Sequence, residues 1–200
     1  MTLHLLRHGV AAGVEGRCIG QTDVPLAAGS ADVFARVAAS WPHARPARLV
    51  ASPLARARAS AAPLAAAWGL APETEPRLAE LDFGAWDGRP WADIEAHDGA
   101  ALGAWMADWA TAAPPGGESF AALRARAEAW LASLTDTADP AGGDTAGDTV
   151  AVAHAGTIRA VLVAVLGLDP AYAFRLDVAH GALTTVRLDP PVLVALNRPF

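Results

Sequence analysis

Two short, largely apolar runs that each end beside a histidine constrain the fold of this chain more than any other feature. The first, Met1–Leu6, leads into Arg7-His8-Gly9, and the second, Val150–His154, leads into Ala155-Gly156. Apolar runs without clear polar alternation are typical of strands in a parallel sheet that is covered on both faces. The sequence therefore predicts two buried strands with an imidazole at the end of each.

Helical and extended segments alternate along the rest of the chain. Strands are also expected at residues 48–51, 75–78, 183–188 and 192–197, and helices at 28–41, 53–68, 91–97, 100–110, 119–134 and 157–166. Ser52 is placed as the N-cap of the second of these helices, and Pro53 as its first residue. This alternation predicts an α/β fold, a three-layer αβα sandwich with a mostly parallel sheet and helices on both faces.

The chain length suits one domain. Its 200 residues can bury a sizeable core but are not obviously enough for two domains. Residues 136–148 are rich in Asp, Thr, Gly and Ala, which is typical of an exposed linker. We interpret residues 1–200 as a single domain with a helical insert at about 88–135 and this linker inside it.

The charged residues exclude several partners and chemistries. A formal net charge of −6 without a basic cluster argues against nucleic acid as a partner. All 15 basic residues are arginine, so Schiff-base and P-loop lysine chemistry are excluded. Arginine would hold any bound anion, because its planar fork suits bidentate phosphate contacts.

The remaining composition is that of a soluble protein of the cytoplasm. Cys18 is the only cysteine, so no internal disulfide can form, which fits a reducing compartment. No segment reaches about 18 uncharged apolar residues, and the N-terminus lacks the pattern of a secretory signal, so we expect no membrane partner. An Ala-rich apolar surface is compatible with a homodimer.

Polar residues follow several of the predicted strands, at the edge where open α/β sheets bind ligands. They are Arg7 and His8, the segment Ser52 to Arg56, Glu80, and His154. Two imidazoles with arginines at one sheet edge indicate chemistry on a phosphate. Arg56 is better placed than Arg58 to meet an anion near the start of its helix, because the two side chains face different sides.

A general acid is expected in the segment that follows residue 78. Three carboxylates, Glu80, Asp82 and Asp87, lie there among two glycines and the aromatic residues Phe83 and Trp86. Burial against an aromatic ring or a neighbouring carboxylate would favour the protonated form of a carboxyl group. The residues alone leave the choice among the three open.

Four motifs in order resemble those of the histidine phosphatase family, the phosphoglycerate mutase-like superfamily. They are Arg7-His8-Gly9, Ser52–Ala57, Glu80–Gly88 and His154-Ala155-Gly156. Within this family the chain is most similar to the α-ribazole phosphatase-type members, which act late in cobalamin nucleotide-loop assembly. That similarity is carried by Gly84–Gly88, by Trp105–Trp109 and by Gly117–Phe120.

The resemblance implies a phosphoglycerate mutase-like fold and a metal-independent phosphomonoesterase that needs no cofactor. His8 would become phosphohistidine, Arg7, Arg56 and His154 would hold phosphate oxygens, and Glu80 would protonate the leaving alcohol. The backbone N–H of Ala155 would add a donor. The substrate would be a small phosphate ester, with α-ribazole phosphate as a candidate.

The chain departs from the family pattern just after Gly9, where Val10, Ala11 and Val14 replace polar residues that the family prefers. Gln21 or Thr22 would then supply the missing phosphate contact. Two alternatives stay open at this point. They are a phosphoglycerate mutase-type phosphoryl transfer, and a catalytically degraded binding or scaffold protein that keeps the fold.

The predicted substrate-binding residues are Gly20, Gln21, Thr22, Ala155 and His180. His180 precedes a glycine in a loop before a late strand, from which it could reach the pocket. Trp105 and Trp109 lie on one helical face and could wall a pocket for an aromatic substrate.

Overall fold

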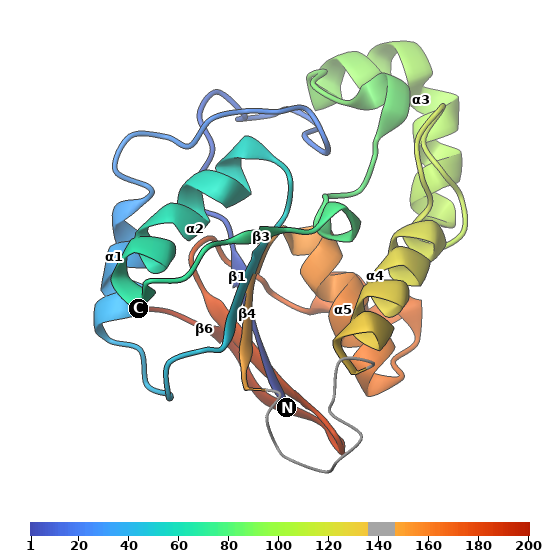
Figure 1. Ribbon diagram of the computed structural model, residues 1–200. Coiled ribbons are helices and arrows are strands. Elements are labelled where there is room, and N and C mark those ends of the chain that lie inside the picture. Colours follow the sequence, from blue (N-terminus) through green and yellow to red (C-terminus); the bar gives the residue numbers. More distant parts are fainter. Residues whose placement is uncertain (136–146) are drawn as a thin grey trace.

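The computed structural model describes residues 1–135 and 147–200, and within them the chain forms one six-stranded sheet (Figure 1). The strands are β1 (Thr2–Arg7), β2 (Arg48–Ala51), β3 (Glu73–Thr74), β4 (Thr149–Ala153), β5 (Leu183–Leu188) and β6 (Pro191–Arg198). Their order is β3-β2-β4-β1-β5-β6. The first four strands in this order pair in parallel, whereas β5 pairs antiparallel with both β1 and β6, so the sheet is mostly parallel as predicted.

Helices cover both faces of the sheet, which confirms the predicted α/β class. They are α1 (Asp32–Ala39), α2 (Ala55–Trp68), α3 (Trp91–Ala107), α4 (Phe120–Thr135) and α5 (Ala155–Leu166), with short 3-10 helices at Pro76–Leu78, Gly84–Trp86 and Pro170–Arg175. In Figure 1, α1 and α2 lie on one side of the sheet and α4 and α5 on the other, while α3 stands away from both layers. None of the helices in residues 1–135 and 147–200 combines the length and the apolar character of a membrane span.

The central strands lack polar alternation because both of their faces are buried. In β4, Val150 and Val152 pack with α1 and α2, whereas Ala151 and Ala153 pack with α4 and α5. Every residue of β4 is buried, so no position along it requires a polar side chain. The apolar run predicted from sequence thus follows from the two layers of helices.

The region predicted as a strand at 75–78 is different in the structure. The strand β3 covers only Glu73–Thr74, and Pro76–Leu78 forms a 3-10 helix. Proline has no N–H to give to a sheet and its φ is fixed, so the ladder cannot continue through Pro76. The Glu75 carboxylate then accepts the Arg77 N–H at 2.9 Å and caps the new turn.

The helix boundaries also differ from those predicted. The helix α2 begins at Ala55 with Leu54 as its N-cap, so Ser52 and Pro53 precede it. The helices predicted at 91–97 and 100–110 correspond to the two halves of α3, which a kink separates at Asp98, where the backbone angles are not helical (φ −123°, ψ 21°). The predicted helix at 28–41 shortens to Asp32–Ala39.

The predicted linker at 136–148 lies mostly outside the described residues. Its described end includes Asp148, whose carboxylate approaches the buried His4 imidazole at 3.4 Å. The interpretation of residues 1–200 as one domain stays a prediction.

Candidate active site

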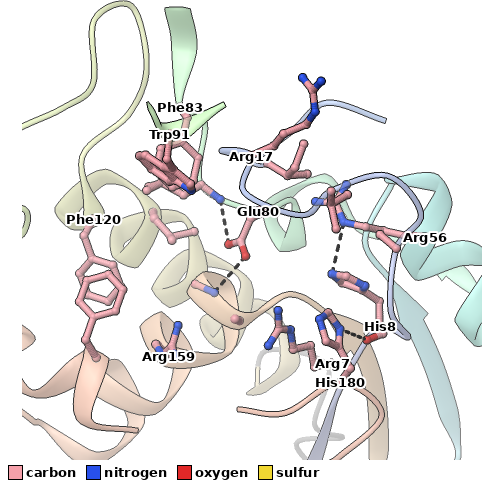
Figure 2. Close-up of a pocket in the computed structure, with 18 residues that line it drawn as sticks. Arg7, His8, Arg17, Arg56, Glu80, Phe83, Trp91, Phe120, Arg159 and His180 are labelled. Carbon is pink, nitrogen blue, oxygen red and sulfur yellow. Dashed lines mark hydrogen bonds between the residues drawn. The ribbon is translucent and has the colours of Figure 1, made fainter. Parts of the chain in front are cut away.

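A cavity of about 300 Å³ opens where several strands end (Figure 2). Arg7 and His8 follow β1, Arg56 lies in the first turn of α2, and Ala155 begins α5 after β4. The carboxyl ends of parallel strands therefore bring these residues together, as expected for an open α/β sheet. Glu80 lines the same cavity from the segment that follows the 3-10 helix Pro76–Leu78.

The His8 imidazole lines this cavity, and its hydrogen bonds fix which ring nitrogen carries the hydrogen. Its Nδ1 lies 2.6 Å from the carbonyl oxygen of Gly9, so Nδ1 must carry the hydrogen in this contact. The other ring nitrogen, Nε2, is left as an acceptor and receives the Arg56 Nε–H at 3.3 Å. A neutral imidazole held in this tautomer is the form that can act as a nucleophile.

Burial keeps His8 neutral. Only 6% of the residue is exposed. This burial lowers the pKa of the His8 imidazole from 6.5 to about 3, and the charge of Arg56 adds to the shift while the hydrogen bond to Gly9 opposes it. Burial likewise lowers the pKa of His154 and of His180 below the usual value.

Four arginines line the cavity, and backbone carbonyls hold each of them in place. Arg7 donates to Val178 at 2.7 Å, Arg17 to Gly88 at 2.8 Å, Arg56 to Thr22 at 3.0 Å, and Arg159 to Leu176 at 3.0 Å. Other arginines do pair with carboxylates, as Arg48 does with Glu73 and Arg126 with Glu118. Carbonyls orient a guanidinium without cancelling its charge, so the cavity stays cationic.

Arg56 is the most buried of these arginines, with 2% of the residue exposed. Besides His8 and Thr22, its guanidinium donates to the carbonyl oxygen of Gly20. A side chain at position 20 could not be accommodated, because a Cβ there would lie 2.2 Å from the Leu81 carbonyl oxygen. The loop at 20–22 thus fits closely against the segment that carries Glu80, and it fixes Arg56 beside His8.

Asp87 fixes that loop in turn. Its carboxylate accepts the backbone N–H groups of Gly20 at 3.0 Å, Gln21 at 2.6 Å and Thr22 at 3.1 Å. The carbonyls of Gly20 and Thr22 therefore face Arg56 while their N–H groups face Asp87. Asp87 acts on the cavity through this loop and does not line it.

His154 lies behind His8, fully buried, with the two ring centroids 4.9 Å apart. Its Nε2 lies 2.7 Å from the Ser52 hydroxyl oxygen, which also accepts the Leu54 N–H at 3.3 Å. The Ser52 proton is therefore free to be donated to Nε2, which places the ring hydrogen on Nδ1. Within the described residues, neither this Nδ1 nor the Nε of Arg7 has a hydrogen-bond partner, and buried groups of this kind are suited to an oxyanion.

Glu80 faces the N-terminus of α5. Its two carboxylate oxygens accept the N–H groups of Gly156 at 3.1 Å and Thr157 at 3.2 Å, and that of Leu81 at 2.9 Å. A Cβ on Gly156 would clash with Glu80 Oε1, so a side chain there would displace the Glu80 carboxylate from this position. The Arg126 guanidinium also holds the Glu80 carbonyl, at 3.0 Å.

The structure separates the three candidate carboxylates. Glu80 is the one whose side chain lines the cavity. Asp82 accepts the Gly84 N–H at 2.8 Å and shapes a turn, and Asp87 holds the loop at 20–22.

The predicted substrate-binding residues fall into two groups. His180 and Ala155 line the cavity, and the His180 Nδ1 lies 2.9 Å from the His8 carbonyl oxygen. Gly20, Gln21 and Thr22 do not line it. The Gln21 amide instead donates to the Glu80 carbonyl at 3.0 Å, so this loop meets the cavity through Arg56 and Glu80.

Sequence reasoning did not single out Arg159, Arg17 or the part played by Asp87. Arg159 could have been found, because it lies four residues after Ala155 on the same face of α5. Arg17 lies in a glycine-rich loop without periodicity, and nothing in the sequence marks it. Of the three residues that depart from the family pattern, Ala11 and Val14 line the cavity, and Val10 is 46% exposed.

The fold and this site define an α/β protein whose sheet edge presents a neutral imidazole, carbonyl-held arginines and one carboxylate, a set suited to a phosphate ester. The chain belongs to the histidine phosphatase superfamily (branch 1), whose family model matches residues 3–197. It is a phosphatase of that superfamily. Within the described residues, no cluster of three or more His, Cys, Asp or Glu side chains could hold a metal ion.

Two curated relatives and one solved structure illustrate the similarity. The chain is 27% identical to the adenosylcobalamin/α-ribazole phosphatase of Salmonella typhimurium over 93% of this chain and 90% of that protein. It is 36% identical to the glucosyl-3-phosphoglycerate phosphatase of Mycobacterium tuberculosis over 84% of this chain and 77% of that protein. The α-ribazole phosphatase from Shigella flexneri has a TM-score of 0.88 at 25% identity, covering 98% of this chain and 96% of that one.

Replacing Asp87 with alanine should weaken the binding of inorganic phosphate. The loop at 20–22 loses the acceptor of three N–H groups, and Arg56 loses its orientation. Because a hydrogen bond to a charged group contributes about 1.5–3 kcal/mol, we expect the dissociation constant measured by calorimetry to rise about tenfold or more. Asp98→Ala, which removes a carboxylate that pairs with Arg89 on the surface, is the matched control. Equal affinities for the two variants would contradict this role of Asp87.

The lowered pKa of His8 should make the folded protein less stable in acid. Between pH 6.5 and about 3 the unfolded chain binds a proton at this residue that the folded protein does not, so stability falls as the pH falls. From pH 7 to pH 5 the wild type should lose about 2 kcal/mol more than His8→Gln, measured by urea unfolding at both pH values. His97→Gln, at an exposed site, is the control. The same pH dependence in His8→Gln and the wild type would show that His8 is not held neutral by the fold.

Proposed function

We propose that this protein is a metal-independent phosphomonoesterase that acts through a phosphohistidine at His8. The observation that carries the proposal is the buried neutral imidazole, whose Nε2 lone pair faces Arg56 while its Nδ1–H is held by the Gly9 carbonyl. Arg7 and Arg159 lie around the same cavity, and Glu80 lines it as well.

In the first step, His8 Nε2 attacks the phosphorus atom of the bound ester. A nitrogen–phosphorus bond forms, and the bond between phosphorus and the ester oxygen breaks. The guanidinium groups of Arg7 and Arg56, with the Nδ1 of His154, hold the non-bridging oxygens and stabilise the charge that develops there. Glu80 gives its proton to the departing oxygen, which leaves as an alcohol.

In the second step, water attacks the phosphorus atom of phosphohistidine. The Glu80 carboxylate takes a proton from this water, the nitrogen–phosphorus bond breaks, and inorganic phosphate leaves. The Nδ1–H of His8 stays bonded to the Gly9 carbonyl throughout, which supports the positive charge that the phosphorylated ring carries. His8 returns to its neutral form with the same tautomer.

The substrate in this proposal is a small phosphorylated metabolite, with α-ribazole phosphate as the candidate. The support is the similarity to α-ribazole phosphatases over almost the whole chain. The similarity to a glucosyl-3-phosphoglycerate phosphatase makes glucosyl-3-phosphoglycerate the competing substrate. A cytoplasmic location and a homodimer stay predictions.

Substitution of His8 and Glu80 tests the chemistry. In the presence of a chelator, His8→Ala should lower the rate of p-nitrophenyl phosphate hydrolysis by about a thousandfold or more, because the nucleophile is lost. Glu80→Gln should slow an alkyl phosphate by about a hundredfold or more but p-nitrophenyl phosphate far less, since p-nitrophenolate leaves without needing a proton. Glu128→Gln, on the surface, is the matched control.

The outcomes separate the three candidate functions. Equal rates for wild type and His8→Ala would contradict the nucleophile. No hydrolysis of any ester by the wild type would favour the scaffold protein. Transfer of the phosphoryl group between phosphoglycerates, without release of phosphate, would favour the mutase.

A substrate panel tests the candidate metabolite. It contains α-ribazole phosphate, glucosyl-3-phosphoglycerate, phosphoglycerates, sugar phosphates and a phosphoprotein. We expect kcat/KM to be about tenfold or more higher for α-ribazole phosphate than for the others, which corresponds to about 1.4 kcal/mol of transition-state binding. A higher value for any other member would replace it as the substrate.

A further inference from the structure

A second cavity of about 460 Å³, the aromatic cavity, adjoins the one that holds His8. It shares the side chains of Phe83, Trp91 and Phe174 with that cavity. Its other walls come from Leu102, Trp105 and Met106 of α3 and from Trp109, which follows the helix. All of these side chains are apolar or aromatic, so the two adjoining cavities differ sharply in chemistry.

The position of Glu80 sets the direction in which a bound ester would extend. In Figure 2, the Glu80 carboxylate lies between His8 and Arg56 on one side and Phe83 and Trp91 on the other. An ester with its phosphorus atom at His8 and its bridging oxygen at Glu80 therefore directs its alcohol portion toward the aromatic side. This step rests on the proposed function, because it places the phosphate at His8.

Phe174 lines both cavities. The Arg159 guanidinium lies 5.3 Å from the centroid of its ring, and the Trp109 ring lies 4.5 Å from it in an edge-to-face arrangement. Although Phe174 and Met106 line the aromatic cavity, they are 56% and 64% exposed. Large apolar side chains that stay exposed at the rim of a cavity are typical of a binding site.

We propose that the aromatic cavity binds a flat aromatic or apolar ring in the alcohol portion of the substrate. A ring of this kind would stack against the indole groups and cover exposed apolar surface. The lining offers no carboxylate, amide or hydroxyl group, and its only polar side-chain groups are indole N–H donors, so most hydroxyl groups of a polyhydroxylated alcohol would lose their water there without a replacement partner. The aromatic cavity would thus select ring-bearing phosphate esters over sugar phosphates.

Two phosphonates that cannot be hydrolysed test this selection directly. Methylphosphonate carries only the group that would bind at His8, whereas naphthylmethylphosphonate adds a bicyclic ring. By calorimetry, the wild type should bind naphthylmethylphosphonate at least about fivefold more tightly than methylphosphonate, because the ring buries apolar surface. Binding is measured without turnover, so the result does not depend on leaving-group chemistry.

A pair of surface substitutions provides the variant and its control. Met106→Glu places a charge at the rim of the aromatic cavity, at a position exposed enough for the fold to accept it. It should reduce the ratio of naphthylmethylphosphonate affinity to methylphosphonate affinity to less than half of its wild-type value. Val194→Glu makes the same charge change at an equally exposed apolar residue on β6, away from both cavities, and should keep the full ratio.

Each outcome decides the question. A wild-type ratio below about fivefold would overturn the proposal that the aromatic cavity binds a ring, and so would a ratio in Met106→Glu that stays above half the wild-type value. In either case, binding of methylphosphonate would still support the phosphate site at His8. Binding of neither phosphonate would overturn the phosphate site and this inference together.

Discussion

The whole site depends on how a buried positive charge is held. Arg56 is almost completely buried, and a buried guanidinium must have its N–H groups paired. A carboxylate partner would satisfy those groups but would also neutralise the charge. Here the partners are the carbonyls of Gly20 and Thr22 and the lone pair of His8, which carry no formal charge. The guanidinium is thus fixed in direction and still free to attract an anion.

The neutral state of His8 and His154 follows from the same placement of uncancelled arginine charges. With arginines close by and little exposure to water, a protonated imidazole would be strongly disfavoured, so His8 and His154 stay neutral without any acidic partner. In many proteins a carboxylate orients a catalytic histidine. At His8 the Gly9 carbonyl does so, and at His154 the Ser52 hydroxyl does. The arginines around the cavity therefore keep their positive charge while the His8 imidazole keeps the lone pair on Nε2.

Much of this could be predicted from the sequence, and the rest could not, for physical reasons. Apolar runs reveal strands that are buried on both faces, and parallel strands bring the residues after them to one edge, so His8, Arg56 and His154 could be placed together. The third strand could not be located, because Pro76 ends a ladder that is only Glu73–Thr74 long. Glu80 lines the cavity and Asp87 holds the loop at 20–22. This difference depends on how that loop packs against a distant segment, and such a contact leaves no periodic signal in the sequence.

The segment that begins at Asp87 joins the loop that orients Arg56 to the helix that lines the aromatic cavity. Asp87 holds the loop that orients Arg56, and four residues later Trp91 begins α3, which supplies most of the aromatic cavity. Between them, Gly88 N–H donates to the Cys18 carbonyl at 2.7 Å, and Cys18 N–H to the Arg89 carbonyl at 2.8 Å. These two bonds anchor the start of α3 to Cys18, just before the loop at 20–22. Most of the α3 side chains that line the aromatic cavity lie in turns farther along the helix. Substitutions in those distal turns would therefore change the lining of the aromatic cavity and leave the hydrogen bonds that orient Arg56 in place.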